Sequence, residues 1–172
     1  MSNFTFKSLL TVATVLGTLG TASTAFAATQ NSASTSATAS AKIITPIAIA
    51  KTADLNFGDV VTGATTGIVT VTTAGARSSS GGATLGNNTG VAASAFAVTG
   101  QASETYAITL PATAVTLSSG SNTMTVDTFT SSLGTTSSIG AGPLNVGGNL
   151  NVGANQATGA YTGTFNVSVN YN

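Results

Sequence analysis

The side chains that could carry acid–base chemistry in this sequence are few and far apart. The chain of 172 residues contains four acidic and four basic residues, and it has no His or Cys. The acidic residues are Asp54, Asp59, Glu104 and Asp127. Without His and Cys, the usual residues of metal sites, thiol chemistry and catalytic triads are missing. A catalytic pair of carboxylates would require a chance approach in the fold, whereas isolated acidic residues usually lie on the surface, so we expect no enzymatic activity.

Metal, phosphate and nucleic-acid binding also lack the residues they need. Asp54 and Asp59 are candidate Ca²⁺ ligands, but no loop has the dense acidic spacing of calcium sites, and Asp54 suits a turn before a strand. Charged residues make up 5% of the chain, which leaves no basic surface for nucleic acid. The glycine-rich stretches do not join a strand to a helix as phosphate-binding loops do. We therefore expect no cofactor, no metal and no nucleic-acid partner.

The elements that position these side chains have the pattern of β-strands joined by turns. Hydrophobic residues make up 42% of the chain and alternate with Thr, Ser and Asn in short runs of period two. The predicted strands are Leu55–Val61, Ile68–Thr73, Val91–Thr99, Glu104–Leu110 and Thr123–Thr130. The predicted surface loops are Arg77–Gly90 and Ser131–Gly142. This spacing predicts one all-β sandwich of about seven strands rather than a closed barrel.

A short internal similarity occurs near the C-terminus. The residues Leu144-Asn145-Val146-Gly147 recur as Leu150-Asn151-Val152-Gly153. One interpretation is a true sequence repeat. The other is a pair of strand segments on either side of a turn or bulge at Gly147-Gly148.

Residues 1–27 have the pattern of a cleaved secretory signal peptide. Lys7 precedes a short apolar run, and Ala25-Phe26-Ala27 supplies the small-x-small motif of a cleavage site. A membrane anchor is the alternative, but the run is short and has no basic stop-transfer flank. We therefore expect secretion by the Sec route to the surface of a bacterium, with the membrane crossed only in transit.

The expected mature chain begins with an N-terminal extension, residues 28–41, followed by a sandwich domain at residues 42–172. In an extended conformation, alternate residues of the extension form one face of small side chains, opposite a mostly polar face. That face consists of Ala33, Thr35, Ala37, Ala39 and Ala41. The same parity continues into a predicted first core strand at Ile43–Ala50. The alternative is that Ala28–Ser40 is a disordered, low-complexity leader.

The C-terminal residues alternate more regularly than any other part of the chain. One face of this predicted strand carries Tyr161, Phe165, Val167, Val169 and Tyr171, and Gly159 precedes it. A final alternating strand with a penultimate Tyr and this glycine resembles the chaperone-recognition strand of chaperone–usher pilins. The resemblance implies an immunoglobulin-like sandwich that lacks its last strand. A periplasmic chaperone, and then the N-terminal extension of the next subunit, would supply that strand.

The mature chain also resembles a bacterial domain family of unknown function, DUF4402. The resemblance is carried by an opening like Ala41–Phe57 and by a close like Leu144–Asn172, with its Val-Gly-Gly and final Gly-x-Tyr-x-Gly. Both ends are also similar to the spore-coat-U-like pilins of archaic pili. The resemblance implies other copies or related pilins as partners, with a periplasmic chaperone and an outer-membrane usher in assembly.

Two functions from different classes follow. The first is a structural subunit of a pilus or surface fibre, which polymerises by donating the strand at Ala33–Ala41 to a neighbour and supports adhesion or biofilm. The second is a self-contained secreted or cell-surface sandwich that folds alone and binds a ligand through its loops. A folded monomer after signal removal would favour the second, because strand donation leaves an isolated subunit incomplete.

Overall fold

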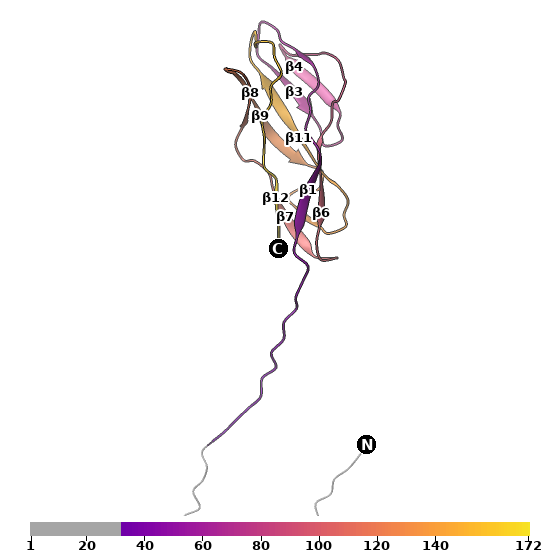
Figure 1. Ribbon diagram of the computed structural model, residues 1–172, viewed down its shortest axis with the longest axis vertical. Coiled ribbons are helices and arrows are strands. Elements are labelled where there is room, and N and C mark those ends of the chain that lie inside the picture. The colour runs from indigo at the N-terminus through magenta and orange to yellow at the C-terminus, as the bar shows by residue number, and fades with distance from the viewer. Residues whose placement is uncertain (1–31) are drawn as a thin grey trace, which may run out of the picture. The chain divides into compact units, whose positions relative to one another are not determined.

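The computed structural model describes residues 32–172, and every regular element among them is a β-strand (Figure 1). Residues 41–172 form one compact unit. Residues 32–40 belong to a separate unit, and they are exposed and outside any strand. The predicted signal peptide, residues 1–27, lies outside the described residues. No helix in the described part of the chain is long and apolar enough to cross a membrane.

Twelve strands, more than the predicted seven, form three antiparallel sheets in this part of the chain. The strands of the seven-stranded sheet are β1 (Ala48–Ala53), β3 (Gly67–Val71), β4 (Arg77–Gly81), β6 (Ser94–Thr99), β8 (Val115–Ser119), β9 (Asn122–Ser131) and β11 (Leu144–Val152). The three-stranded sheet has the order β10 (Thr136–Ser138), β7 (Thr105–Thr109), β12 (Ser168–Tyr171). The smallest sheet pairs β2 (Val60–Val61) with β5 (Thr84–Leu85).

The long strand β11 organises the largest sheet. Along one edge, its first residues pair with β6 and its later residues pair with β3. Its other edge pairs with β9, with a register irregularity between Gly147 and Asn149. The two similar tetrapeptides, except for Gly153, therefore lie in one continuous strand; the bulge that the second interpretation placed at Gly147-Gly148 lies in the partner strand β9, opposite Gly148.

Buried side chains from the facing sheets form two hydrophobic clusters. The first core cluster consists of Phe57, Val69, Val71, Ala83, Val126, Leu150 and Val152. The second core cluster consists of Phe96, Tyr106, Ile108, Leu144, Val146 and Val169. In the second cluster, β6 and β11 of the large sheet pack against β7 and β12 of the three-stranded sheet. The predicted all-β sandwich is thus confirmed.

A bulge in β9 allows both clusters to receive a side chain from the same strand. Val126 is buried in the first cluster, whereas Phe129, three residues later, packs against both clusters. In a regular strand these two positions would face opposite sides, because side chains alternate with a period of two. The register irregularity opposite Gly147–Asn149 includes Thr128, whose φ is 49°, and it returns Phe129 to the core side.

The two predicted surface loops were partly wrong. Arg77–Gly90 contains β4 and β5, and Ser131–Gly142 contains β10. These strands are short, rich in Ser and Thr, and mostly exposed. Their pairing rests on backbone hydrogen bonds to β3, β2 and β7, which require no hydrophobic alternation in the sequence.

The predicted strand at Leu55–Val61 is also wrong as a continuous element, since only Val60–Val61 forms a strand. Gly58 has a φ of 67° and interrupts the extended backbone. The Asn56 side chain accepts a hydrogen bond from the Gly58 N–H at 2.8 Å, which stabilises this turn.

The first core strand begins later than predicted. The sequence indicated Ile43–Ala50, whereas β1 covers Ala48–Ala53. Ala48 pairs with Thr99, the last residue of β6, so the residues before Ala48 have no strand beside them for continued pairing.

The backbone at Thr128 gives a direct stability prediction. A β-branched residue in the left-handed region is strained, and glycine adopts that conformation freely. We expect Thr128→Gly to raise the free energy of unfolding by about 1 kcal/mol in urea denaturation. The control is Thr130→Gly in the same strand. It should lower the free energy of unfolding by about 0.5–1 kcal/mol, because glycine weakens a regular strand. Equal losses for both variants would contradict the bulge geometry.

Candidate functional site

A groove with a volume of about 1130 Å³ runs between two segments that are distant in the sequence. One wall is formed by residues 51–62, which continue from β1 into β2, and the other wall is formed by residues 156–165. We call these segments the N-terminal wall and the C-terminal wall. The floor between them is lined by hydrophobic residues of β8, β9 and β11: Leu117, Met124, Val126, Phe129, Leu150 and Val152. The groove therefore opens onto the first core cluster: Val126, Leu150 and Val152 are buried beneath it, and Leu117, Met124 and Phe129 are half-buried.

The walls meet near both ends of the groove but are not paired along it. At one end, the Asn155 N–H donates to the Gly63 carbonyl at 2.8 Å. At the other end, the Tyr171 hydroxyl donates to the Thr45 carbonyl at 2.8 Å, and β1 contacts β12. Within residues 32–172, no strand ladder or β-bridge joins the two walls. The space between them is thus bounded by backbone on both sides and has the length of an extended segment.

The C-terminal wall has few backbone partners of its own. From Ala157 of this wall to Val167 beyond its end, all in the described chain, Thr162 alone bonds to another backbone group through its N–H and C=O. Its partner is Ser118 of β8, at 2.9 and 3.0 Å. An extended segment with free N–H and C=O groups is a template for pairing with another strand.

Gly159, which the sequence singled out, lies where this wall approaches β8. A side chain at Gly159 would collide with the Ser119 hydroxyl, and one at Gly163 would lie 2.5 Å from the Thr116 carbonyl. Close approach to the backbone of β8 explains Gly163, and close approach to the Ser119 side chain explains Gly159. Tyr161 stabilises the backbone around Gly159. Its hydroxyl donates to the Ala157 carbonyl and accepts from the Gln156 side chain, both at 2.8 Å.

The other C-terminal residues of the predicted row keep their parity. Val169 is buried in the second core cluster, and Phe165, Val167 and Tyr171 are half-buried against that cluster, while the residues between them are exposed. The Phe165 ring lies 4.9 Å from the Phe129 ring, centroid to centroid, in the groove.

The predicted continuous C-terminal strand is nevertheless too long. Ladder pairing covers only Ser168–Tyr171, and the first pair is Ser168 with Thr109 of β7. The partner strand ends there because Pro111, two residues later, has no backbone N–H to donate.

Arg77 holds the N-terminal wall in place, and the sequence analysis missed this role. Its guanidinium donates to the carbonyls of Phe57 (2.7 Å), Asp59 (3.0 Å), Gly86 (3.0 Å) and Asn87 (3.2 Å). The wall is thereby tied to the segment after β5. The only signal in the sequence was one arginine in a chain with very few charges, and that signal does not identify carbonyl partners.

Of the remaining predicted residues, Asp54 and Asp59 lie in the N-terminal wall and line the groove, whereas the others do not line it. Ala33, Thr35, Ala37, Ala39 and Ala41 are exposed and belong to no strand. The four carboxylates do not gather in one place either: Asp54 pairs with Lys51, and Glu104 pairs with Lys42. Residues 32–172 contain no group of three or more acidic residues that could hold a metal ion.

Comparison with protein families gives one match, to the model described as "Domain of unknown function (DUF4402)", over residues 47–171. The chain belongs to the DUF4402 family. The matched region includes both walls of the groove and β12. Comparison with curated proteins and with solved structures gives no match.

The contact between Phe165 and Phe129 predicts a loss of stability on truncation. Fully buried Phe→Ala changes typically cost about 3–5 kcal/mol, and since Phe165 is half-buried we expect Phe165→Ala to lower the free energy of unfolding by about 2 kcal/mol. The exposed neighbour Asn166→Ala should change it by less than about 0.5 kcal/mol in the same urea titration. Equal effects of the two variants would show that the parity is wrong.

The carbonyl contacts of Arg77 predict a local effect at the N-terminal wall. Arg77→Met keeps much of the side-chain length but removes the donor from two part-buried and two exposed carbonyls, so we expect the free energy of unfolding to fall by about 1–3 kcal/mol and hydrogen exchange at residues 57–61 to become faster. Lys51→Met removes an exposed ion pair and should cost less than about 1 kcal/mol. Unchanged exchange at residues 57–61 in Arg77→Met would contradict this role.

Proposed function

We propose that this protein is a structural subunit of a bacterial surface pilus or fibre, exported and polymerised by donor-strand complementation, which supports adhesion or biofilm. The observation that carries the proposal is the groove between the two walls. It has a hydrophobic floor and is bounded by two backbone segments of about ten residues each, between which one extended segment could lie. Insertion of a strand there would bury the floor and pair both edges at once.

The N-terminal extension is the segment we propose as the donor. Ala33–Ala41 carries small side chains on one face, which suits a groove between closely spaced walls, and a polar face that can remain in water. Each extended residue spans about 3.3 Å, so this segment and the C-terminal wall have nearly equal lengths. Alanine methyl groups contribute little hydrophobic energy, so pairing along the two walls supplies much of the attachment.

Donation from one copy to the next produces a filament. The donor segment and the acceptor groove are different surfaces of the same chain, and such a heterologous contact grows without limit unless the rotation closes a ring. The partners are therefore other copies or related pilins. By resemblance to chaperone–usher pilins, a periplasmic chaperone and an outer-membrane usher would assist assembly, after export directed by residues 1–27. No enzymatic role is proposed.

Deletion of the extension tests this function. We expect the chain without residues 28–41 to retain its β-rich circular dichroism but to form no fibres in electron microscopy. In the full chain, Ala37→Asp with Ala39→Asp should also prevent fibres, because two carboxylates would be buried without partners. The matched control is Ser36→Asp with Thr38→Asp on the opposite face, which should still allow fibres.

Two results would contradict the proposal. One is normal fibre formation without residues 28–41. The other is a full chain that remains monomeric and whose C-terminal wall is already protected from hydrogen exchange, which would favour the self-contained module with ligand-binding loops.

A further inference from the structure

Ile43 is the most exposed large hydrophobic residue among residues 32–172, with 97% of its surface accessible. The next two, Val61 and Ile68, are 57% and 38% exposed. Full burial of an isoleucine side chain contributes about 1.5–3 kcal/mol, and none of that stabilisation is realised within this chain. Singly exposed hydrophobic residues are common on surfaces, so the case for Ile43 rests on what surrounds it.

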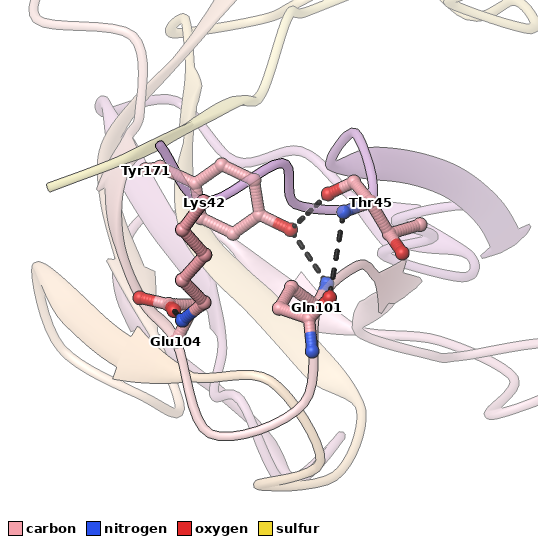
Figure 2. Close-up of polar contacts among 5 residues, drawn as sticks. All are labelled: Lys42, Thr45, Gln101, Glu104 and Tyr171. Carbon is pink, nitrogen blue, oxygen red and sulfur yellow. Dashed lines mark hydrogen bonds and ion pairs between the residues drawn. The ribbon is translucent and has the colours of Figure 1, made fainter. Parts of the chain in front are cut away.

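Residues on both sides of Ile43 make polar contacts, which Figure 2 shows: the Lys42 side chain forms an exposed ion pair, and the Thr45 backbone forms hydrogen bonds. Lys42 forms an ion pair with Glu104 at 2.7 Å. The Thr45 carbonyl accepts from the Tyr171 hydroxyl at 2.8 Å, and that hydroxyl accepts from the Gln101 N–H at 2.6 Å. We call the contacts of Tyr171 with Thr45 and Gln101 the Tyr171 latch.

The latch requires a specific local backbone. A side chain at Gly100 would collide with the Tyr171 hydroxyl, so the phenol occupies space that only a glycine leaves free. The penultimate residue of the chain thus binds the segment that precedes β1. Ile43, two residues before Thr45, is held at this point of the domain while its side chain remains in solvent.

The parity of Ile43 connects it with the proposed donor segment. Position 43 continues the row of Ala33, Thr35, Ala37, Ala39 and Ala41. In an extended donor, Ile43 would face the same way as these residues, toward the groove floor. It would be the largest side chain in the row.

The two ends of the groove are not equivalent for assembly. The Tyr171 end of an acceptor carries the acceptor's own Ile43 and the start of its own extension, so a donor arriving there would bring the two extensions together and favour reciprocal exchange in a closed dimer. Arrival at the opposite end keeps the acceptor's extension free for a third copy, as growth of a filament needs. At that end Asp59, Gln156, Phe57 and Val152 line the groove.

We propose that Ile43 is the anchoring side chain of the donor and that it packs at the Asp59–Gln156 end of the groove of a second copy of this chain. This inference rests on the proposed function. The Tyr171 latch holds the backbone of the donor next to this contact, so that Ile43 enters the neighbouring groove from a fixed position. The occupant of this end of the groove is therefore the same chain, and the contact adds hydrophobic energy that the alanines lack.

Binding of a synthetic peptide tests the role of the side chain. The acceptor is the full chain carrying Ala37→Asp and Ala39→Asp, so that its own extension cannot fill the groove. A fluorescent peptide of residues 33–43 should bind, and the peptide with Ile43→Ser should bind about 10- to 100-fold more weakly in fluorescence anisotropy. The control peptide, Lys42→Gln, changes the opposite face and should bind within about two-fold of the original.

Disulfide formation tests the orientation, with no background because the sequence has no cysteine. A peptide with Ile43→Cys should cross-link to an acceptor with Asp59→Cys and not to one with Lys51→Cys, at the Tyr171 end of the groove. Equal affinity of the original and Ile43→Ser peptides, or cross-linking at position 51, would overturn this inference and leave strand donation standing. Absence of binding by the original peptide would overturn both.

Discussion

The separation of residues 51–62 from residues 156–165 is the constraint on which the rest of this structure depends. The walls meet near each end of the groove, yet between those points a hydrophobic floor lies between them and most of the C-terminal wall has no backbone partner. In many sandwiches a strand lies between two such edges. In the proposed function, this separation is what lets an extended segment of another copy complete the domain, so that stability and assembly are linked.

Several features keep the groove open rather than letting it collapse. Arg77 fixes the N-terminal wall through four carbonyl contacts, and Gly159 allows the C-terminal wall to lie directly against β8. The bulge at Thr128 turns Phe129 toward both core clusters, where its ring meets Phe165. Each wall is therefore held by contacts with other parts of the domain, and no strand ladder or β-bridge in residues 32–172 joins one wall to the other.

The sequence predicted the parts of the fold in which hydrophobic alternation and strand pairing coincide. Period two located β3, β7 and β9, and it placed Phe165, Val167 and Val169 on one face. It did not locate β4 or β10, since exposed serine and threonine strands pair through the backbone alone. No local pattern predicts contacts between residues that are far apart in the chain. The groove depends on such contacts, and so do the carbonyl contacts of Arg77 and the position of Tyr171 beside Gly100.

Hydrogen exchange of the C-terminal wall, compared between monomer and fibre, tests the central claim most directly. In the monomer, Thr162 is bonded to Ser118, whereas its neighbours from Ala157 to Val167 have no backbone partner in the described chain. The account predicts protection of Thr162 alone in the monomer, and new protection at alternate residues of this wall in the fibre, because a paired strand edge bonds every second residue. Equal protection of the wall in the two states would contradict it.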